Sequence, residues 1–353
     1  MTQRPSGHPA APASPATPER GKRPTMGDVA AHIGVSRQLV SLVLRNAPGP
    51  SAESRERVLR AAAELGYHPD TAAQMLRRGR SRHLGVLFTM RHAFDVALVE
   101  GIYPAAEQLG YSVALGATGP SRDERKAVED LLGYRIEALI LIGPYLSPKR
   151  LATLAQQLPV VEIGRGMNLT GVDSVRSADD RGAEQAVDHL VGLGHRAIVH
   201  VDGGTMPGAN ERRRGYRTAM RRHGLGEHIR ILPGDYTEES GARAARELLA
   251  ADQSPTAVLA GNDLCAHGLL DTLVRAGLTV PGDVSVVGYD DSEIAGFSFI
   301  DLTTIRQDAV QMAQLAVQAA TERLDDGRTS DRDIVLDPTL VVRGTTGPPR
   351  SRR

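Results

Sequence analysis

The sequence predicts a small all-α head followed by a larger α/β body with two lobes, each built on a doubly wound parallel sheet. Between Thr25 and Leu65, apolar residues recur at helical spacing around a tight turn that contains glycine. From His83 onward, short apolar runs alternate with amphipathic helical runs, as in repeated βαβ units. The length of 353 residues suits two or three domains. About 260 residues of βαβ units exceed one sheet, so we expect two lobes with a cleft between them.

The head is predicted to contain three short helices. The first covers 26–33 and stops at a glycine. The second starts from an N-cap serine, Ser36, and runs to about Arg45. The third starts at Ser51, after a Pro/Gly loop, and ends at another glycine. Two short helices across a tight turn, supported by a third, are typical of a helix-turn-helix domain, which we expect over residues 25–68.

The body, residues 83–343, is predicted from its apolar runs. The strands are expected at 84–89, 111–115, 138–142, 159–163, 197–201, 228–232, 256–260 and 284–288. Helices are expected between them, for instance at 96–109, 182–193, 211–222, 239–250 and 263–276.

Both ends of the chain lack the apolar residues that would fold them. Residues 1–24 are rich in Pro, Ala and Ser, and we expect a disordered arm there. Residues 344–353 contain Gly, Pro and Arg and are expected to form a flexible tail. The tail has no leucine repeat, which argues against a tetramerising helix.

Charge is distributed unevenly although the chain as a whole is neutral. Residues 22–82 contain 11 Lys and Arg against 5 Asp and Glu, a net charge of +6, whereas residues 83–342 carry −11. A basic module in front of an acidic body is typical of a nucleic-acid-binding head attached to a regulatory domain.

The sequence also indicates a compartment. The single cysteine, Cys265, cannot form an internal disulfide. The first thirty residues contain no apolar run of signal-peptide length, and no apolar run reaches the ~20 residues that cross a bilayer. We therefore expect a cytoplasmic protein without a membrane span.

The second helix of the head carries the residues suited to reading DNA. Its first turn presents Arg37, which can bond guanine O6 and N7 together, and Gln38, which can bond adenine N6 and N7. Ser36, Ser41 and Arg45 are suited to phosphate contacts. The alternative is a helix that packs on a partner and leaves Arg37 and Gln38 merely solvated.

Longer motifs resemble the LacI/GalR family of bacterial transcription regulators. They are Thr25 to Ser41, Ser51 to Val58, Leu65 to Asp70, Asp188 to Arg196, Gly215 to Arg217, Val286 to Asp291 and Leu302 to Asp308. The resemblance covers roughly residues 24–345 and implies a body like that of periplasmic binding proteins. It adds Thr25, Met26 and Leu42 to the DNA-binding positions. Leu39 stands where the family usually has threonine and Leu42 where it usually has arginine, so the operator sequence is expected to differ; an apolar Leu42 can touch a thymine methyl but cannot bond a guanine.

The resemblance also implies a hinge helix in residues 69–82. In the family this helix orders on DNA and a leucine wedges into the minor groove; Leu76 stands at that position, with Ala73 beside it. The alternative is that Leu76 is an ordinary core residue within a basic linker.

Polar residues follow the predicted strands of the body. Arg165, Asp202, Asn262 and Asp290 each come after a strand, and ligands of open α/β sheets bind outside the carboxyl ends of strands. Arginine, carboxylate and amide groups together can bond vicinal hydroxyls.

The resemblance assigns effector contacts in the same cleft. It matches Arg212, Asn262, Asp290 and Gln307 to effector-binding positions and places Phe94 and Asp95 in the variable contact region of the first lobe. Tyr236 lies where the family often has a stacking aromatic residue. With no Trp and only four Phe in the chain, Phe94, Phe297 and Phe299 are expected to border the cleft. The alternatives are caps for Asn262 and Asp290, and packing or dimer contacts for Phe297 and Phe299.

Other classes of protein are disfavoured. The sequence has no Gly-x-Ser-x-Gly elbow, no phosphate loop and no His-Glu-x-x-His, so we expect no enzyme and no cofactor. Cys265 and His267 lie two residues apart on a helix and hence on different faces, which argues against a metal pair. An exported sugar-binding protein would lack the basic head.

The expected function is that of a homodimeric repressor. We expect it to bind a pseudo-palindromic operator and to respond to a small sugar-like effector. A purine or another corepressor is the alternative effector.

Overall fold

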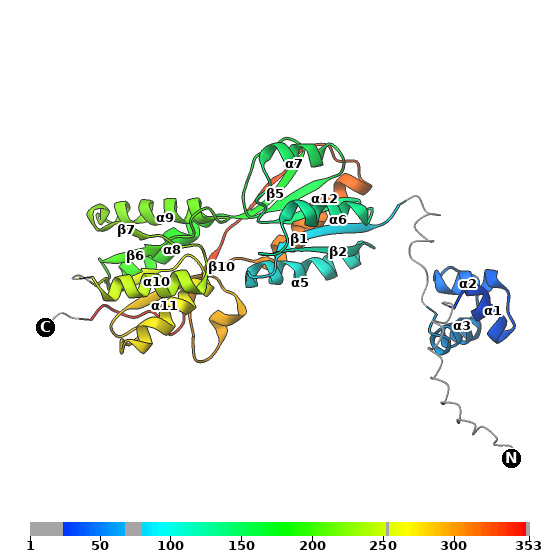
Figure 1. Ribbon diagram of the computed structural model, residues 1–353, viewed down its shortest axis with the longest axis horizontal. Coiled ribbons are helices and arrows are strands. Elements are labelled where there is room, and N and C mark those ends of the chain that lie inside the picture. Colours follow the sequence, from blue (N-terminus) through cyan, green and yellow to red (C-terminus); the bar gives the residue numbers. More distant parts are fainter. Residues whose placement is uncertain (1–23, 68–79, 252–253, 351–353) are drawn as a thin grey trace, which may run out of the picture. The chain divides into compact units, whose positions relative to one another are not determined.

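The computed structural model describes residues 24–67, 80–251 and 254–350, and these fall into two compact units that divide between Arg80 and Ser81 (Figure 1). The first unit is the head, with α1 (Met26–Ile33), α2 (Arg37–Leu44) and α3 (Ala52–Glu64). The second unit is the body, which contains two six-stranded sheets. The predicted fold class is therefore confirmed.

Local capping explains where the helices of the head begin and end. Thr25 and Asp28 form a capping box at the start of α1, and Gly34 ends it at φ 67°, in the left-handed region that glycine tolerates. Ser36 Oγ accepts from the Leu39 amide, at 3.1 Å, and so caps α2. The three helices bury a small common core, made of Val29, Ala30, Val40, Val43, Val58, Ala61 and Ala62.

Lobe 1 comprises residues 81–177 and 309–336. Its sheet has the order β11-β5-β4-β3-β1-β2, and every pair is parallel. The strands are β1 (His83–Thr89), β2 (Ser112–Thr118), β3 (Ala138–Ile142), β4 (Val160–Ile163), β5 (Val172–Ser177) and β11 (Asp333–Leu336). The helices are α5 (Ala93–Gln108), α6 (Glu124–Gly133), α7 (Pro148–Ala155) and α12 (Ala309–Asp325).

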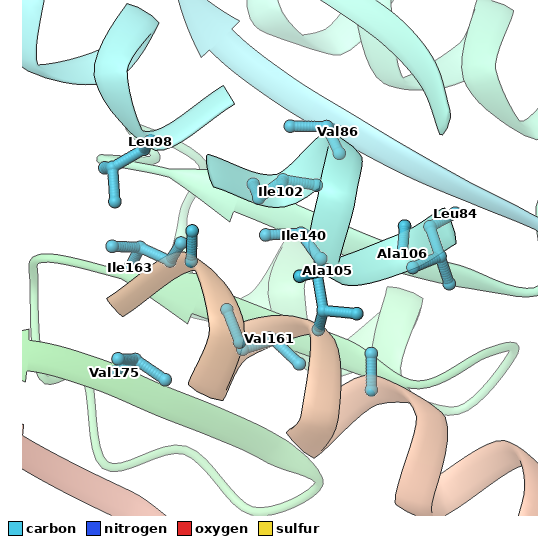
Figure 2. Packing of buried hydrophobic residues seen from close by; sticks show 14 of the residues in the cluster. Leu84, Val86, Leu98, Ile102, Ala105, Ala106, Ile140, Val161, Ile163 and Val175 are labelled. Atoms are coloured by element: carbon cyan, nitrogen blue, oxygen red, sulfur yellow. The ribbon is translucent and has the colours of Figure 1, made fainter. Parts of the chain in front are cut away.

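The two faces of this sheet are covered by different helices. Helices α5 and α12 bury one face, where Ile102 packs with Val86 and Ile140 (Figure 2). Helices α6 and α7 cover the other face. Helix α12 comes from the end of the chain, so lobe 1 is assembled from two distant segments.

Lobe 2 comprises residues 178–308 and 337–350. Its sheet has the order β12-β10-β9-β8-β6-β7, in which only β12 is antiparallel to its neighbour. The strands are β6 (Ile198–Val201), β7 (Arg230–Leu232), β8 (Ala257–Leu259), β9 (Ser285–Asp290), β10 (Thr303–Arg306) and β12 (Thr339–Val341). The helices are α8 (Asp179–Gly192), α9 (Ala209–Arg222), α10 (Glu238–Leu249) and α11 (Asp263–Arg275), with short 3-10 turns η1 (Gly226–His228) and η2 (Glu293–Gly296).

Glycines allow the helices of lobe 2 to pack closely in pairs. Helices α8 and α9 cover one face, and α10 and α11 cover the other. A Cβ on Gly215 of α9 would lie 2.1 Å from the carbonyl oxygen of Asp180 on α8. Such a contact is impossible, so the close approach of these helices requires glycine at that position.

The chain passes between the lobes three times, after β5, after β10 and after β11. Several elements were not predicted, namely β5, β10, β11, β12, α6, α7 and α12. The expectation of a flexible tail is wrong for residues 344–350. Thr345 is buried, its carbonyl accepts from the Val286 amide at 2.9 Å, and its hydroxyl donates to the Val286 carbonyl at 2.7 Å. The arm and the hinge fall almost wholly outside the described residues.

Candidate functional site

A cleft with about 530 Å³ of empty space, part of it open to solvent, lies in the body and takes its lining from both lobes. Lobe 1 contributes the start of α5 and the carboxyl ends of β3 and β4. Lobe 2 contributes the starts of α8, α9 and α11 and the end of β9. The lining residues are His92, Phe94, Asp95, Leu98, Ile142, Gly143, Ile163, Gly164, Asp179, Met206, Pro207, Arg212, Tyr236, Asn262, Asp290 and Gln307. The cleft thus lies where parallel sheets bind ligands.

Arg212 is the centre of the polar wall. It is 5% exposed, and its Nε donates to Asp179 Oδ1 at 2.9 Å while its Nη1 donates to the Gly261 carbonyl at 2.7 Å. Its Nη2 lies 3.6 Å from Asp290 Oδ1, and its guanidinium stacks on the Tyr289 ring, 3.6 Å from the centroid. The side chain is therefore fixed in place by protein contacts on every side.

Asp290 ends β9 at φ 111°, a conformation in the positive-φ region that non-glycine residues rarely adopt. Gln307 Nε2 donates to its Oδ1 at 2.8 Å. Burial raises the pKa of the Asp290 carboxyl above its ordinary value, and the positive charge of Arg212 opposes that rise. The strained backbone turns this carboxylate into the cleft.

Asp263 lies behind Asp290 and shares its electrostatic environment. Ser292 donates to its Oδ2 through the amide and the hydroxyl, at 2.7 and 2.9 Å, and Thr304 Oγ1 donates to its Oδ1 at 2.6 Å. Burial raises the pKa of Asp263, and the nearby Asp290 carboxylate raises it further. Asp263 therefore supports the β9 turn from inside the protein.

The apolar part of the cleft is formed mainly by lobe 1. Phe94, Leu98, Ile142 and Ile163 lie on that side. Tyr236 faces them from lobe 2, where its hydroxyl donates to the Pro207 carbonyl at 3.2 Å. A flat apolar surface beside polar groups suits the ring of a sugar or a base.

Asn262 and Asp95 line the cleft and each also accepts a hydrogen bond from a backbone amide. Asn262 Oδ1 accepts from the Cys265 amide at 2.9 Å and so caps α11. The capping alternative is thus confirmed, and its amide nitrogen stays available for a ligand. Asp95 Oδ2 accepts from the Thr89 amide at 3.0 Å. His92 Nδ1 lies 3.8 Å from the same oxygen, and this carboxylate raises the pKa of His92.

Seven of the nine predicted effector contacts line the cavity, and two do not. Arg165 lies at the rim, where its Nη2 donates to the Thr205 carbonyl at 3.3 Å and its guanidinium stacks over Tyr145. Phe297 is 40% exposed and stacks on Phe299, with 5.7 Å between the ring centroids, outside the lining residues.

Two polar lining residues were not predicted. His92 directly precedes α5, and Asp179 lies in the first turn of α8. Asp179 comes two residues after the end of β5, so recognising that polar strand would have identified it.

In the head, α2 presents Arg37 and Gln38 as exposed side chains on its first turn, as predicted. Ser36 and Thr25 use their side-chain oxygens as helix caps, and Met26 packs against the core of the head. Leu39 also packs there, whereas Leu42 is half-buried. The Arg45 side chain donates through Nε to the Ser41 carbonyl at 3.0 Å. Ala73 and Leu76 lie outside the described residues.

Within the described ranges, no group of three His, Cys, Asp or Glu residues is placed to hold a metal ion. Cys265 is buried, and burial raises the pKa of its thiol to about 11. No helix in the described part of the chain is long and apolar enough to span a membrane.

Known proteins match both units. Residues 25–70 match the lacI family of bacterial regulatory proteins, and residues 187–346 match the periplasmic binding protein-like domain. The lactose operon repressor of Escherichia coli K12 is 33% identical over 334 residues, which are 93% of this chain and 92% of the repressor.

Solved structures agree with these matches. A LacI transcriptional regulator from a Rhodococcus species is 47% identical and covers 75% of this chain and 98% of its own, with a TM-score of 0.74. The lac repressor dimer bound to operator and the anti-inducer ONPF is 30% identical over 92% of this chain and 100% of its own, with a TM-score of 0.75. The chain therefore belongs to the lacI family of bacterial regulatory proteins and is a ligand-responsive DNA-binding transcriptional regulator.

Proposed function

We propose that this regulator is a homodimeric repressor whose cleft binds a small sugar-like effector and thereby controls the affinity of the head for a pseudo-palindromic operator. The observation that carries the proposal is the cavity between the lobes, with a fixed Arg212–Asp290 wall facing apolar residues. The lac repressor, whose dimer was solved with operator, supports the homodimer and the DNA partner. We assign no catalytic role to the cleft.

Within this proposal the described residues have distinct roles. Arg37 and Gln38 read bases, while Ser36, Ser41 and Arg45 fix the register on phosphates. Thr25, Met26 and Leu42 complete the DNA surface of the head. Residues 69–82 act as a hinge, with Ala73 and Leu76 entering the minor groove.

The effector contacts are assigned to the cleft lining and its rim. Arg212, Asp290, Asn262 and Gln307 bond the hydroxyls of the effector. The remaining contacts come from Phe94, Asp95 and Tyr236, with Arg165 at the rim. Phe297 is not among these contacts, because it lies outside the cavity lining.

Effector binding shifts the lobes between two states, of which one favours DNA. A ligand can only shift such an equilibrium through its differential affinity for the two states, and the coupling is typically about 1–3 kcal/mol. A purine or another corepressor is the second candidate, because the aromatic rings of Phe94 and Tyr236 also suit a base.

The DNA half of the proposal is tested by Arg37→Ala. Loss of a bidentate base contact should weaken binding to the cognate operator by about 1–3 kcal/mol and relax specificity at one base pair. Fluorescence anisotropy on an operator and its single-base variants measures both effects. Equal loss on every sequence would instead make Arg37 a phosphate contact.

The effector half is tested by a thermal-shift screen of the full chain against sugars, polyols, sugar phosphates, purines and nucleosides. A ligand at about 100 times its Kd adds about 2.7 kcal/mol of stability. A saturable shift that also changes operator affinity supports a sensor. Stabilisation without any change in operator affinity would contradict it.

A further inference from the structure

The cleft contains more carboxylates than cations. Asp95, Asp179 and Asp290 line it, and Arg212 is the only guanidinium among the lining residues of the described chain. Among these lining residues, His92 is the other side chain that can carry a positive charge. The net charge of the lining is therefore negative when the three carboxyl groups are ionised. Only a positively charged ligand would neutralise it.

Arg212 has little left to offer an anion. Its Nε and Nη1 donate to Asp179 and to the Gly261 carbonyl, and Nη2 faces Asp290. The Tyr289 ring covers one face of the guanidinium. An arginine binds phosphate or carboxylate strongly when both prongs of its fork are free. Here Nε and Nη1 are already hydrogen-bonded, which leaves only Nη2, 3.6 Å from Asp290 Oδ1, for a ligand. Arg212 neutralises the protein's own carboxylates instead of attracting a negative ligand.

The neighbouring arginines are engaged as well. Arg213 donates through Nε and Nη2 to Asp202 Oδ2, at 3.0 and 2.5 Å. Arg165 donates through Nη2 to the Thr205 carbonyl and stacks over Tyr145. Its Nε is buried without a hydrogen-bond partner in the described structure, but Arg165 lies outside the cavity lining. Neither residue supplies a positive site inside the cleft.

Two carboxylates on opposite walls each keep one oxygen free of protein donors. Asp95 of lobe 1 accepts from the Thr89 amide through Oδ2, and Asp290 of lobe 2 accepts from Gln307 through Oδ1. Among the described residues, no hydrogen bond reaches Asp95 Oδ1 or Asp290 Oδ2. Both side chains are nearly buried, and these two oxygens are left to accept from whatever fills the cleft.

We propose that the effector is a polyhydroxylated compound without negative charge, either neutral or amine-bearing, which donates hydrogen bonds to Asp95 and Asp290 and so bridges the two lobes. The cleft excludes phosphorylated and carboxylated forms of the same compound. This rests on the proposed function, since it describes the ligand of the same cleft. The physical reason is that a phosphate group close to three carboxylates is repelled, and water in a narrow cavity screens that repulsion poorly.

The test compares matched compounds on the full chain at constant ionic strength. The probes are galactose, galactosamine and galactose 1-phosphate; glucose, glucosamine and glucose 6-phosphate; ribose and ribose 5-phosphate; and adenosine with its monophosphate. Thermal shift identifies which parents bind, and isothermal titration then gives the Kd of each member of that series. The phosphate ester should bind at least about 10-fold more weakly than its parent.

Asp95→Asn serves as the diagnostic variant because an amide oxygen can still accept from the Thr89 amide. Removing this one negative charge should lower the ratio of the Kd of the phosphate ester to the Kd of its parent by at least about 3-fold. Asp337→Asn is the matched control, because Asp337 is an exposed carboxylate paired with Arg181 outside the cleft. The Asp337→Asn substitution should leave the ratio of the two Kd values unchanged.

Each outcome decides the proposal. A phosphate ester that binds as tightly as its parent overturns it, and so does a panel in which no compound binds. If that phosphate ester also changes operator affinity, the proposed sensor function stands while the charge selectivity fails. If a neutral parent binds selectively but leaves operator affinity unchanged, the selectivity stands and the sensor function fails.

Discussion

The two walls of the cleft are built in different ways. Lobe 2 presents charged groups that hold one another, with Arg212 set between Asp179 and Asp290 and Gln307 bonded to Asp290. Lobe 1 presents mostly apolar side chains and a single carboxylate, Asp95. The comparison indicates that lobe 2 carries a preformed polar surface, whereas lobe 1 supplies a mostly apolar wall.

The largest effect is expected from breaking the polar wall. Arg212→Ala leaves Asp179 and Asp290 buried without their cation, which should lower the free energy of unfolding by about 3–5 kcal/mol. Urea denaturation measures the change. The control is Arg214→Ala on the same helix, whose pair with Asp180 is exposed and should contribute only about 0–1 kcal/mol. An equal loss of unfolding free energy in the two variants would contradict the distinction between the buried and the exposed ion pair.

Acid should weaken the same lobe through His200. This histidine is buried on β6, and burial lowers its pKa to about 4. In the unfolded chain it regains its ordinary pKa, 6.5, so the unfolded state takes up a proton first as the pH falls. His200 alone should therefore lower the free energy of unfolding by about 3 kcal/mol between about pH 6.5 and about pH 4. The raised pKa values of Asp263 and Asp290 in the same lobe act in the opposite direction over this window, because the folded state binds their protons first.

This acid response is measured by urea denaturation at several pH values in that window. His200→Gln should remove the His200 contribution, so the stability of this variant relative to the wild type should improve by about 3 kcal/mol from pH 6.5 to pH 4. Replacing the exposed His228 with Gln should leave the pH dependence of stability unchanged. The same pH slope in all three proteins would show that His200 is not its source.

Helix packing behind the polar wall is tested by two glycines of lobe 2. In Gly215→Ala the new Cβ would meet the Asp180 carbonyl oxygen, so α8 and α9 must move apart, at a cost of about 1–3 kcal/mol. Gly192→Ala lies near the end of α8 with open space around its Cβ and should stabilise the helix by up to about 1 kcal/mol. Thermal unfolding distinguishes the two variants, because the melting temperature should fall in Gly215→Ala and rise in Gly192→Ala. Two shifts in the same direction would contradict the packing argument.

A smaller loss of stability than at the polar wall is expected at the apolar wall. Phe94 is half-buried at the start of α5, and Phe94→Ala should cost about 1–2 kcal/mol, less than Arg212→Ala. Effector affinity should fall in the same variant because the ring loses its contact with the ligand. A stability loss as large as that of Arg212→Ala would show that the lobe 1 wall is as rigid as the lobe 2 wall.

The two walls also differ in how well the sequence predicts them. Asn262 and Asp290 follow apolar strands, so periodicity alone placed them at the carboxyl edge, while Arg212 and Gln307 came from the family resemblance. Strand β5 was missed because it carries Asp173, a fully buried carboxylate that Arg323 and Arg328 neutralise from distant segments. No local pattern marks such a strand. Phe297, which the sequence predicts at the border of the cleft, lies outside the cavity lining, because loop position alone does not determine which way a side chain faces.

The central claim is that the cleft controls the DNA-binding head. It is tested most directly by measuring operator affinity with and without a cleft ligand, in the wild-type protein and in Asp290→Asn. The wild-type affinity should change by about 1–3 kcal/mol on ligand binding, whereas Asp290→Asn should bind the operator normally and lose the response. An unchanged response in Asp290→Asn, or an effector that leaves wild-type operator affinity untouched, would contradict the account.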